Sequence, residues 1–271
     1  MILQTLTLLR NINKALLISL PLFCCGLQMQ AQRLTEAEVT AKLNEAFALD
    51  NAKKTAEALD AFLIVGKNTE QQRNEVEHQV YICSQTMACM CYETLNRYEE
   101  AYLLAKKLIA GNLTEKEKKD VGHLYAMNGY MYATSFKHGD NKQLVKARTI
   151  LEEIMPYAYG KVRENALTKI SLSWFFEGSK YYLSQQYDKA LTCYQNALKG
   201  YQKLGKTKDE ISVLRHIAEI KGTLYDVAGS EDAYKQALVL AKQIGKTDVQ
   251  MKILKELWNL GNRIGNVHNS L

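Results

Sequence analysis

The chain has 271 residues, and its 47% hydrophobic content is enough to build a sizeable buried core. Its formal net charge of +6 is mild and forms no basic stripe interleaved with aromatic residues, so nucleic-acid binding is not indicated. Only two prolines occur, and no segment alternates β-branched and polar residues as strands do. The composition therefore predicts an all-α protein.

The N-terminal segment has the pattern of a secretory signal peptide. Arg10 and Lys14 are followed by an apolar run over residues 15–25 and by a polar tail over residues 26–32, in which Ala31 is the predicted cleavage residue. This run is too short to span a bilayer, which takes about 20 apolar residues. We therefore predict a leader at residues 1–31, with an uncleaved anchor as the alternative.

The remainder, residues 32–271, is expected to form one exported domain, periplasmic or associated with the cell envelope. Removing the leader leaves 33 basic against 29 acidic side chains, a net charge of +4. No later segment is apolar enough to cross a membrane, so any membrane association would go through the N-terminus only. A lipid anchor at Cys24 or Cys25 is disfavoured because Phe23 stands where such signals need a small residue.

Residues 171–204 carry the most informative pattern in this domain. In order, the marked positions are Trp174, Gly178, Tyr181, Ala190, Tyr194 and Ala197. Small residues allow two helices to cross closely, and the other positions share helical stripes around that crossing. The pattern resembles the tetratricopeptide repeat, a helix–turn–helix unit. One departure is Glu177, which stands where the family usually has Leu.

The same unit recurs along the chain. The small residue of the first helix is found at Ala46, Cys89, Gly129, Gly178, Gly222 and Gly261, at spacings of 43, 40, 49, 44 and 39 residues. The second helix offers Ala58, Ala101, Ala147, Ala190 and Ala233. The third unit fits worst, because it carries extra residues around 138–141. Units of this kind bury their faces on their neighbours and so form one solenoid.

The resemblance implies a right-handed superhelical α-solenoid of about five hairpins plus a closing helix. The sixth unit contains a first helix around Leu257–Ile264, with too few residues after it for a second helix. Two interpretations stay open for this end: a closing helix that offers a polar outer face, or a chain that is cut short relative to a longer relative.

The sequence offers no clear catalytic or metal-binding group. Its five histidines are scattered without H-E-x-x-H spacing, and paired carboxylates such as Glu99-Glu100 are typical of exposed helix surfaces. After the leader, the cysteines are Cys83, Cys89, Cys91 and Cys193, all interpreted as small buried residues. We therefore expect no enzymatic activity, no cofactor and no metal.

One motif, Gly200 to Thr207, matches the G-x4-G-K-T nucleotide-binding loop letter for letter. Such a loop needs a strand before it and a helix after it. Here the motif falls at the end of a predicted helix, so Gly205 is expected to be a left-handed helix cap. A segment forty residues later keeps Gly245-Lys246-Thr247, as a repeat junction would. Nucleotide binding is thus only a distant alternative.

Arrays of this family usually bind peptide segments on the concave face lined by first helices. The helical spacing predicts that this face contains Phe47, Met90, His123, Tyr130, Phe175, Ser179, Tyr182, His216, Thr223 and Trp258. This aromatic, lightly charged set suits an apolar peptide or partner helix. The competing interpretation is that these aromatic residues only pack one repeat on the next.

Two functions follow from the resemblance. The first is a non-enzymatic exported scaffold that binds a protein or peptide partner. The second is the sensory ectodomain, or a truncated form, of an envelope two-component or transcriptional regulator.

Overall fold

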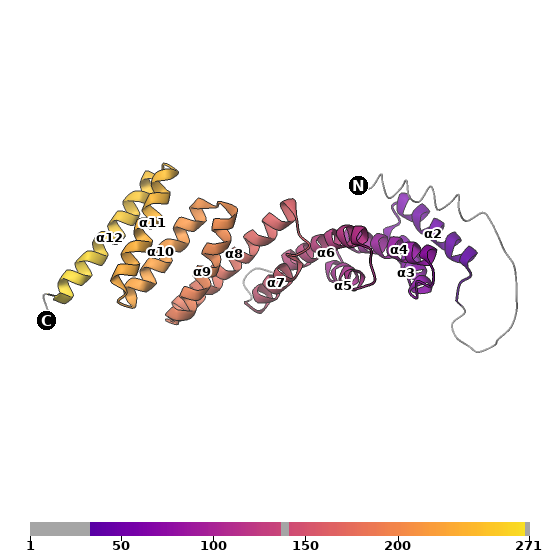
Figure 1. Ribbon diagram of the computed structural model, residues 1–271, viewed down its shortest axis with the longest axis horizontal. Helices are drawn as coiled ribbons and strands as arrows, with labels where there is room; N and C mark the ends of the chain where they lie inside the picture. Colours follow the sequence, from indigo (N-terminus) through magenta and orange to yellow (C-terminus); the bar gives the residue numbers. More distant parts are fainter. Residues whose placement is uncertain (1–32, 137–140, 269–271) are drawn as a thin grey trace.

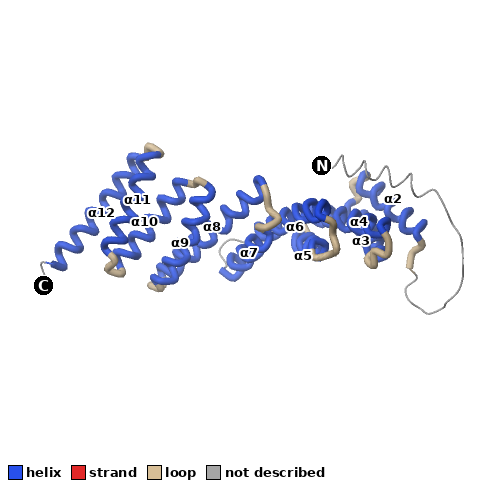
Figure 2. The backbone as a smooth tube through the Cα atoms, in the orientation of Figure 1, coloured by secondary structure: helices blue, strands red, loops and turns tan. Residues whose placement is uncertain are grey.

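The computed structural model describes residues 33–136 and 141–268, which form an elongated array of helices (Figure 1). The predicted leader at 1–31 and the extra residues 138–140 lie outside this part. Within the described ranges there are eleven helices and no strand (Figure 2). The first and last of these helices stand at opposite ends of the molecule.

The helices form five successive hairpins and a closing helix. The hairpins are α2 (Glu36–Asn51) with α3 (Thr55–Thr69), α4 (Glu75–Thr94) with α5 (Tyr98–Ile109), α6 (Glu115–Ser135) with α7 (Asn141–Ile154), α8 (Gly160–Leu183) with α9 (Tyr187–Leu204), and α10 (Thr207–Thr223) with α11 (Val227–Gln243), followed by α12 (Thr247–His268). Each helix packs mainly on the helices next to it in the sequence, as in a solenoid. The protein is therefore an all-α solenoid of tetratricopeptide-like hairpins.

Four of the five hairpins close with the same short turn. One residue in each turn has a left-handed backbone, with φ between 57° and 64°: Lys53, Asn96, Gln185 and Tyr225. The amide of the following residue then donates to a carbonyl five residues earlier, as Gln186 does to Tyr181 at 2.9 Å. This is the hydrogen bond of a Schellman cap, which satisfies the last carbonyls of the first helix. The turn recurs without glycine, at a cost in backbone strain.

Small residues mark the crossings inside the hairpins. A Cβ added to Gly178 would lie 3.0 Å from Tyr194 Cδ1, and one added to Gly222 would lie 3.2 Å from Ser230 Oγ. Ala46 and Cys89 are fully buried at the equivalent places. The helices can approach this closely because no larger side chain separates them.

The third hairpin departs from the predicted register. Ala147 is only half-buried, and the residue that covers Gly129 is Ile154, whose Cγ2 would lie 2.5 Å from an added Cβ. The crossing has therefore moved along α7 towards its C-terminus. The prediction that Ala147 marks this crossing was wrong because spacing alone cannot detect a shift of a whole helix along its partner.

The junction between α7 and α8 explains the departure at Glu177. Arg148 is 7% exposed, and its Nη1 lies 2.5 Å from Glu177 Oε2. Its guanidinium also covers the Trp174 ring, 3.5 Å from the centroid. A carboxylate thus replaces the usual leucine because the preceding hairpin brings a buried arginine to this point.

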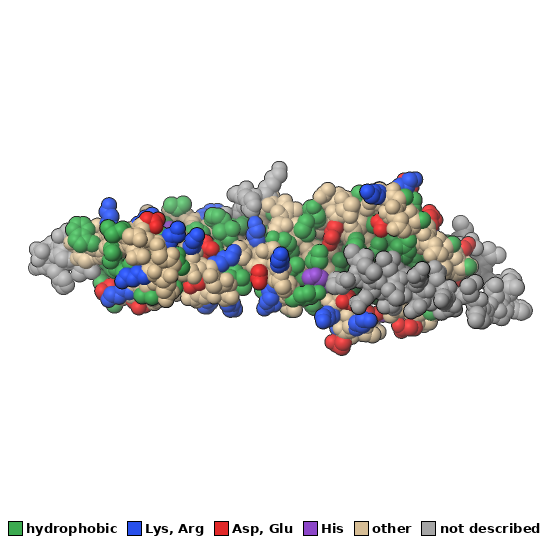
Figure 3. All heavy atoms as spheres, turned by 90° about the horizontal axis from the view of Figure 1, so that it is seen from above, with side chains coloured by type: hydrophobic (Ala, Val, Ile, Leu, Met, Phe, Trp, Pro, Cys, Tyr) green, Lys and Arg blue, Asp and Glu red, His purple; other side chains and the backbone are tan. Residues whose placement is uncertain are grey.

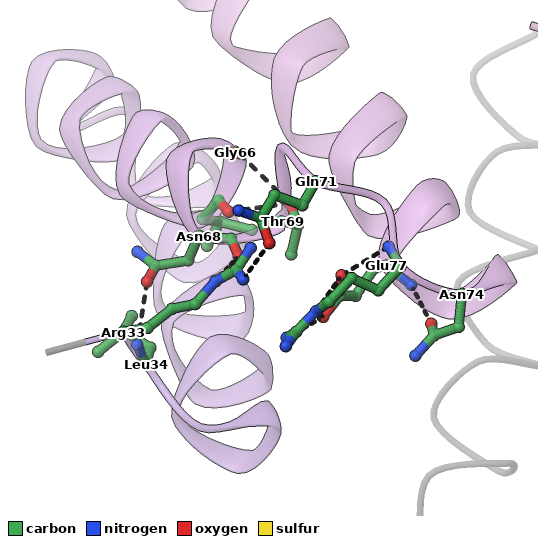
Figure 4. A network of polar contacts seen from close by, with 10 residues as sticks. Arg33, Leu34, Gly66, Asn68, Thr69, Gln71, Asn74 and Glu77 are labelled. Carbon is green, nitrogen blue, oxygen red and sulfur yellow. Dashed lines mark hydrogen bonds and ion pairs between the residues drawn. The ribbon is translucent and has the colours of Figure 1, made fainter. Parts of the chain in front are cut away.

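The N-terminal entry to the solenoid is fixed by polar contacts at the end of α3 (Figure 4). Arg33 Nε donates to the carbonyl of Asn68 at 3.0 Å, and the Leu34 amide donates to Asn68 Oδ1 at 3.0 Å. Thr35 then caps α2 in a capping box with Glu38. These contacts therefore hold the start of α2 against the C-terminal end of α3.

Candidate interaction surface on the first helices

The first helices of successive hairpins contact one another and share one side of the solenoid. Glu117 on α6 accepts from Gln79 on α4 at 3.1 Å and lies 3.0 Å from His78 Nε2. Tyr182 on α8 donates to Glu219 on α10 at 2.8 Å. Arg215 on α10 pairs with Glu256 on α12. Polar contacts thus align the helices that were predicted to line the concave face.

The ionisation of these groups follows from their surroundings. Burial raises the pKa of Tyr182 to about 12, and its bond to Glu219 adds to the rise. Burial works to raise the pKa of Glu117, but hydrogen bonds from Thr114 and His78 outweigh it and leave the pKa lowered. At neutral pH Glu117 is therefore an anion and Tyr182 a neutral donor.

Most of the predicted concave-face aromatics make contacts within the solenoid. Phe47 packs edge-on against Phe62, with ring centroids 5.2 Å apart. Phe175 lies 5.5 Å from Tyr194 and 5.4 Å from His216. Phe47 and Phe175 are half-buried, and their contacts join one helix to the next. These rings therefore have a packing role, while a binding role for them stays a prediction.

Other members of the predicted set are also engaged. His123 stacks on Tyr159, with centroids 4.1 Å apart. Ser179 Oγ lies 3.0 Å from the Tyr194 hydroxyl, and Thr223 Oγ1 donates to the carbonyl of Glu219 at 2.9 Å. Tyr130 is half-buried against the central core cluster. Met90 and Trp258 differ from these residues because they are exposed, Met90 by 38%.

The structure adds exposed apolar residues that the sequence analysis did not select. Met127 and Met131 on α6 are each 37% exposed, and Phe176 and Leu183 on α8 are more exposed still. Each pair is spaced by four or seven residues and so shares a helix face. Met131 and Phe176 stand directly after Tyr130 and Phe175 of the predicted set. The i, i+4 methionine pair was the signal that could have identified these exposed residues.

Three buried polar atoms on these helices, one of them Asn128 Oδ1 on α6, have no hydrogen-bond partner among the described residues. The other two are Glu93 Oε1 on α4 and His123 Nδ1 on α6. Burial raises the pKa of Glu93 and lowers the pKa of His123. His216, stacked on Tyr194, also has a pKa lowered by burial. The imidazoles of His123 and His216 are therefore neutral at neutral pH.

The segment that matches a nucleotide-binding loop has the geometry of a helix cap. Gly200 lies inside α9, and Gly205 has φ 61° at the end of that helix. The Gly205 amide donates to Gln202 and the Lys206 amide to Tyr201, at 3.1 and 3.0 Å. These amides thus bond to the helix, as in the hairpin turns. The predicted left-handed cap at Gly205 is confirmed.

The cysteines differ slightly from the prediction. Cys89, Cys91 and Cys193 are buried, whereas Cys83 is half-buried, so the prediction of four buried residues was wrong at one position. None of these four is in a disulfide. Burial raises the thiol pKa of Cys83 to about 11.

Charges are interspersed with apolar side chains on the face seen in Figure 3. In the part of the chain that the structure describes, no cluster of His, Cys, Asp or Glu could hold a metal ion. No helix over residues 33–136 or 141–268 is long and apolar enough to cross a membrane.

Comparison with known proteins gives similarity in helix arrangement only. No family model and no curated protein matches the chain. TTC0263, a thermophilic TPR protein of Thermus thermophilus, is 14% identical, with a TM-score of 0.29, over 81% of this chain and 99% of its own.

Two further solved structures are similar in the same way. The TPR-like repeats of a putative kinesin light chain from Podospora anserina are 13% identical, with a TM-score of 0.33, over 78% of this chain and 98% of theirs. BtubC from P. vanneervenii is 12% identical, with a TM-score of 0.28, over 84% and 90%. The assignment to tetratricopeptide-like hairpins rests on the turns and crossings of this chain itself.

Proposed function

We propose that the protein is a non-enzymatic scaffold that binds an apolar peptide or partner helix on the side lined by its first helices. The supporting observation is the exposed methionine set Met90, Met127 and Met131 on α4 and α6. Side chains with three rotatable bonds and a polarizable sulfur adapt to apolar partners of different shape. The half-buried aromatic residues beside them hold the helices that present this set.

The proposed partner carries apolar side chains on a helix or an extended segment. Glu93 lies one turn after Met90 on α4, and its carboxylate has a buried oxygen without a partner in the described chain. A basic side chain beside the apolar ones would complement this oxygen. We further propose that the scaffold is exported, on the strength of the pattern in residues 1–31.

The binding surface can be tested by selecting peptides from a displayed random library against the full chain. Peptides that bind the wild type are then compared by fluorescence anisotropy with a Met90→Glu/Met127→Glu/Met131→Glu variant. We expect its affinity to fall by about tenfold or more, because three charges replace apolar contacts.

The matched control is Leu103→Glu/Val239→Glu. Both residues are exposed and apolar, but they lie on the second helices α5 and α11. This control should bind like the wild type. Equal loss in both variants, or no loss in the methionine variant, would place binding elsewhere.

Export has a separate test. Mass spectrometry of the protein recovered from an envelope fraction should find an N-terminus at Gln32. A protein that is recovered only from the soluble cell interior with Met1 intact would exclude export.

A further inference from the structure

The closing helix α12 uses only part of its apolar surface. Ile253 and Leu260 are buried in the core shared with α10 and α11, and Glu256 pairs with Arg215. A second apolar stripe is open instead. Met251, Leu254 and Trp258 are 64%, 46% and 67% exposed. Spacings of three and four residues place this stripe on one helix face with Gly261.

The equivalent face of α8 packs against the second helix of its hairpin. Counting from the crossing glycine, Gly178, Phe175 and Ser171 stand where Gly261, Trp258 and Leu254 stand in α12. Gly178 and Phe175 contact Tyr194 of α9, and Ser171 packs against Gly200 at the other end of α9. In α8 this face is therefore the site on which the second helix packs. The same site on α12, formed by Leu254, Trp258 and Gly261, is called the seat below.

No described residue covers that seat on α12. A Cβ added to Gly261 would meet no atom within 4 Å, whereas the glycines that mark the other crossings have neighbours at 2.5 to 3.1 Å. Beside it, a groove of about 410 Å³ runs between α11 and α12. Val227 of α11 and Leu257 and Trp258 of α12 line this groove, and the Glu231–Lys235 ion pair stands on the α11 side. Gly261, the small residue of the sixth first helix, thus faces no second helix within the described chain.

We propose that α12 seats an amphipathic helix of a partner protein, antiparallel to α12, which completes a sixth hairpin. The helix would present small residues opposite Gly261 and an aromatic or aliphatic residue against Trp258. In α8 the same face packs against the second helix α9, and in α10 it packs against α11. The proposed interface would repeat these two. This proposal does not rest on the methionine surface.

A partner helix fits the seat better than a second copy of α12. The helices that fill this place in the chain bring alanines at the contact, as α9 does with Ala190 and Ala197. The open stripe of a second α12 would instead bring Leu254 and Trp258 against the same two residues. Bulky groups on both sides would hold the helices apart and lose the close approach that Gly261 permits.

The chain supplies its own probes for this seat. Labelled peptides of α9, residues 187–204, and α11, residues 227–243, are titrated with the full chain and followed by anisotropy and by tryptophan emission. We expect one peptide to bind per chain, with a blue shift from Trp258. A peptide with Tyr194→Lys and Ala197→Lys should not bind.

Two variants locate the binding. Leu254→Glu and Gly261→Leu should each weaken the peptide by about tenfold or more, because one adds a buried charge and the other fills the crossing. Both residues are exposed, so both variants should keep the helicity of the wild type. The Met90→Glu/Met127→Glu/Met131→Glu variant should bind the probes normally, which separates this seat from the proposed function.

Three results would overturn the proposal. The first is failure of both peptides to bind at concentrations up to about 1 mM. The second is binding that neither Leu254→Glu nor Gly261→Leu weakens. The third is a dimer in sedimentation analysis that Leu254→Glu dissociates, since a second copy would then occupy the seat.

Discussion

The third and fourth hairpins reach the same arrangement by different chemistry. In the fourth, Gly178 meets Tyr194, and a left-handed turn at Gln185 joins the helices. In the third, the crossing has moved to Ile154, and polar groups surround it. Glu153 accepts from Tyr102 at 2.9 Å and from Tyr125, and lies 2.7 Å from Lys106 Nζ.

The difference shows how a solenoid tolerates an irregular unit. Where the spacing departs from the repeat, ion pairs and tyrosine hydroxyls make specific contacts to the flanking hairpins. On the other side, Arg148 of the third hairpin pairs with Glu177 of the fourth hairpin. The irregular unit is thus tied to its neighbours on both sides.

Breaking the Arg148–Glu177 pair should have the largest effect. Arg148→Ala would leave the mostly buried Glu177 carboxylate unpaired, at a cost of about 3–5 kcal/mol in the free energy of unfolding. Urea denaturation followed by circular dichroism measures this loss. The double variant Arg148→Met/Glu177→Leu should recover most of it, since no charge is left buried. A single variant as stable as wild type would show that the pair does not join the two hairpins.

Filling the regular crossing comes next. Gly178→Leu should cost about 1–3 kcal/mol, because the added side chain collides with Tyr194. Gly261→Leu is the matched control at the open crossing, and it should leave the unfolding curve of the chain alone unchanged. Equal effects at both positions would contradict the assigned register.

Acid should weaken the third hairpin through Glu153. Burial works to raise its pKa, but bonds from Lys106, Tyr125 and Tyr102 outweigh burial and lower it. A lowered folded-state pKa contributes stability above the unfolded value, which is lost as pH falls through the folded value. Wild type should therefore be more stable than Glu153→Gln at pH 7, and the gap should close at acid pH. A gap that stays constant with pH would mean that the charge of Glu153 does not contribute.

Relieving a strained turn should have a smaller effect, of opposite sign. Tyr225 is exposed and left-handed, with φ 64°. Tyr225→Gly should raise stability by up to about 1 kcal/mol, because glycine adopts this backbone without steric cost. Asn96→Gly is the comparison, with a smaller gain, since asparagine tolerates the left-handed region. A loss of stability in Tyr225→Gly would mean that the ring makes a contact worth more than the strain.

Adding a nucleotide should have the smallest effect on the stability of the protein. ATP should not change the melting temperature of wild type or of Lys206→Ala, since the Gly205 and Lys206 amides bond to α9. A rise of several degrees in the wild type that Lys206→Ala abolishes would overturn this interpretation.

The sequence by itself determined the class of fold. Small residues at regular spacing predicted the six first helices, and the buried alanines Ala58, Ala101, Ala190 and Ala233 confirm the second-helix pattern in four hairpins. This worked because close helix crossings admit few residue types, and the spacing of those residues is local information. The same logic predicted the cap at Gly205.

The tertiary structure alone decided which surfaces are open. The shift of the crossing in α7, the partner of Glu177 and the exposure of Met127 and Met131 all depend on how a neighbouring helix is placed. Phe175, which is half-buried, and Trp258, which is exposed, occupy the same position in the repeat and look alike in the sequence. They differ because α9 covers one and no described helix covers the other.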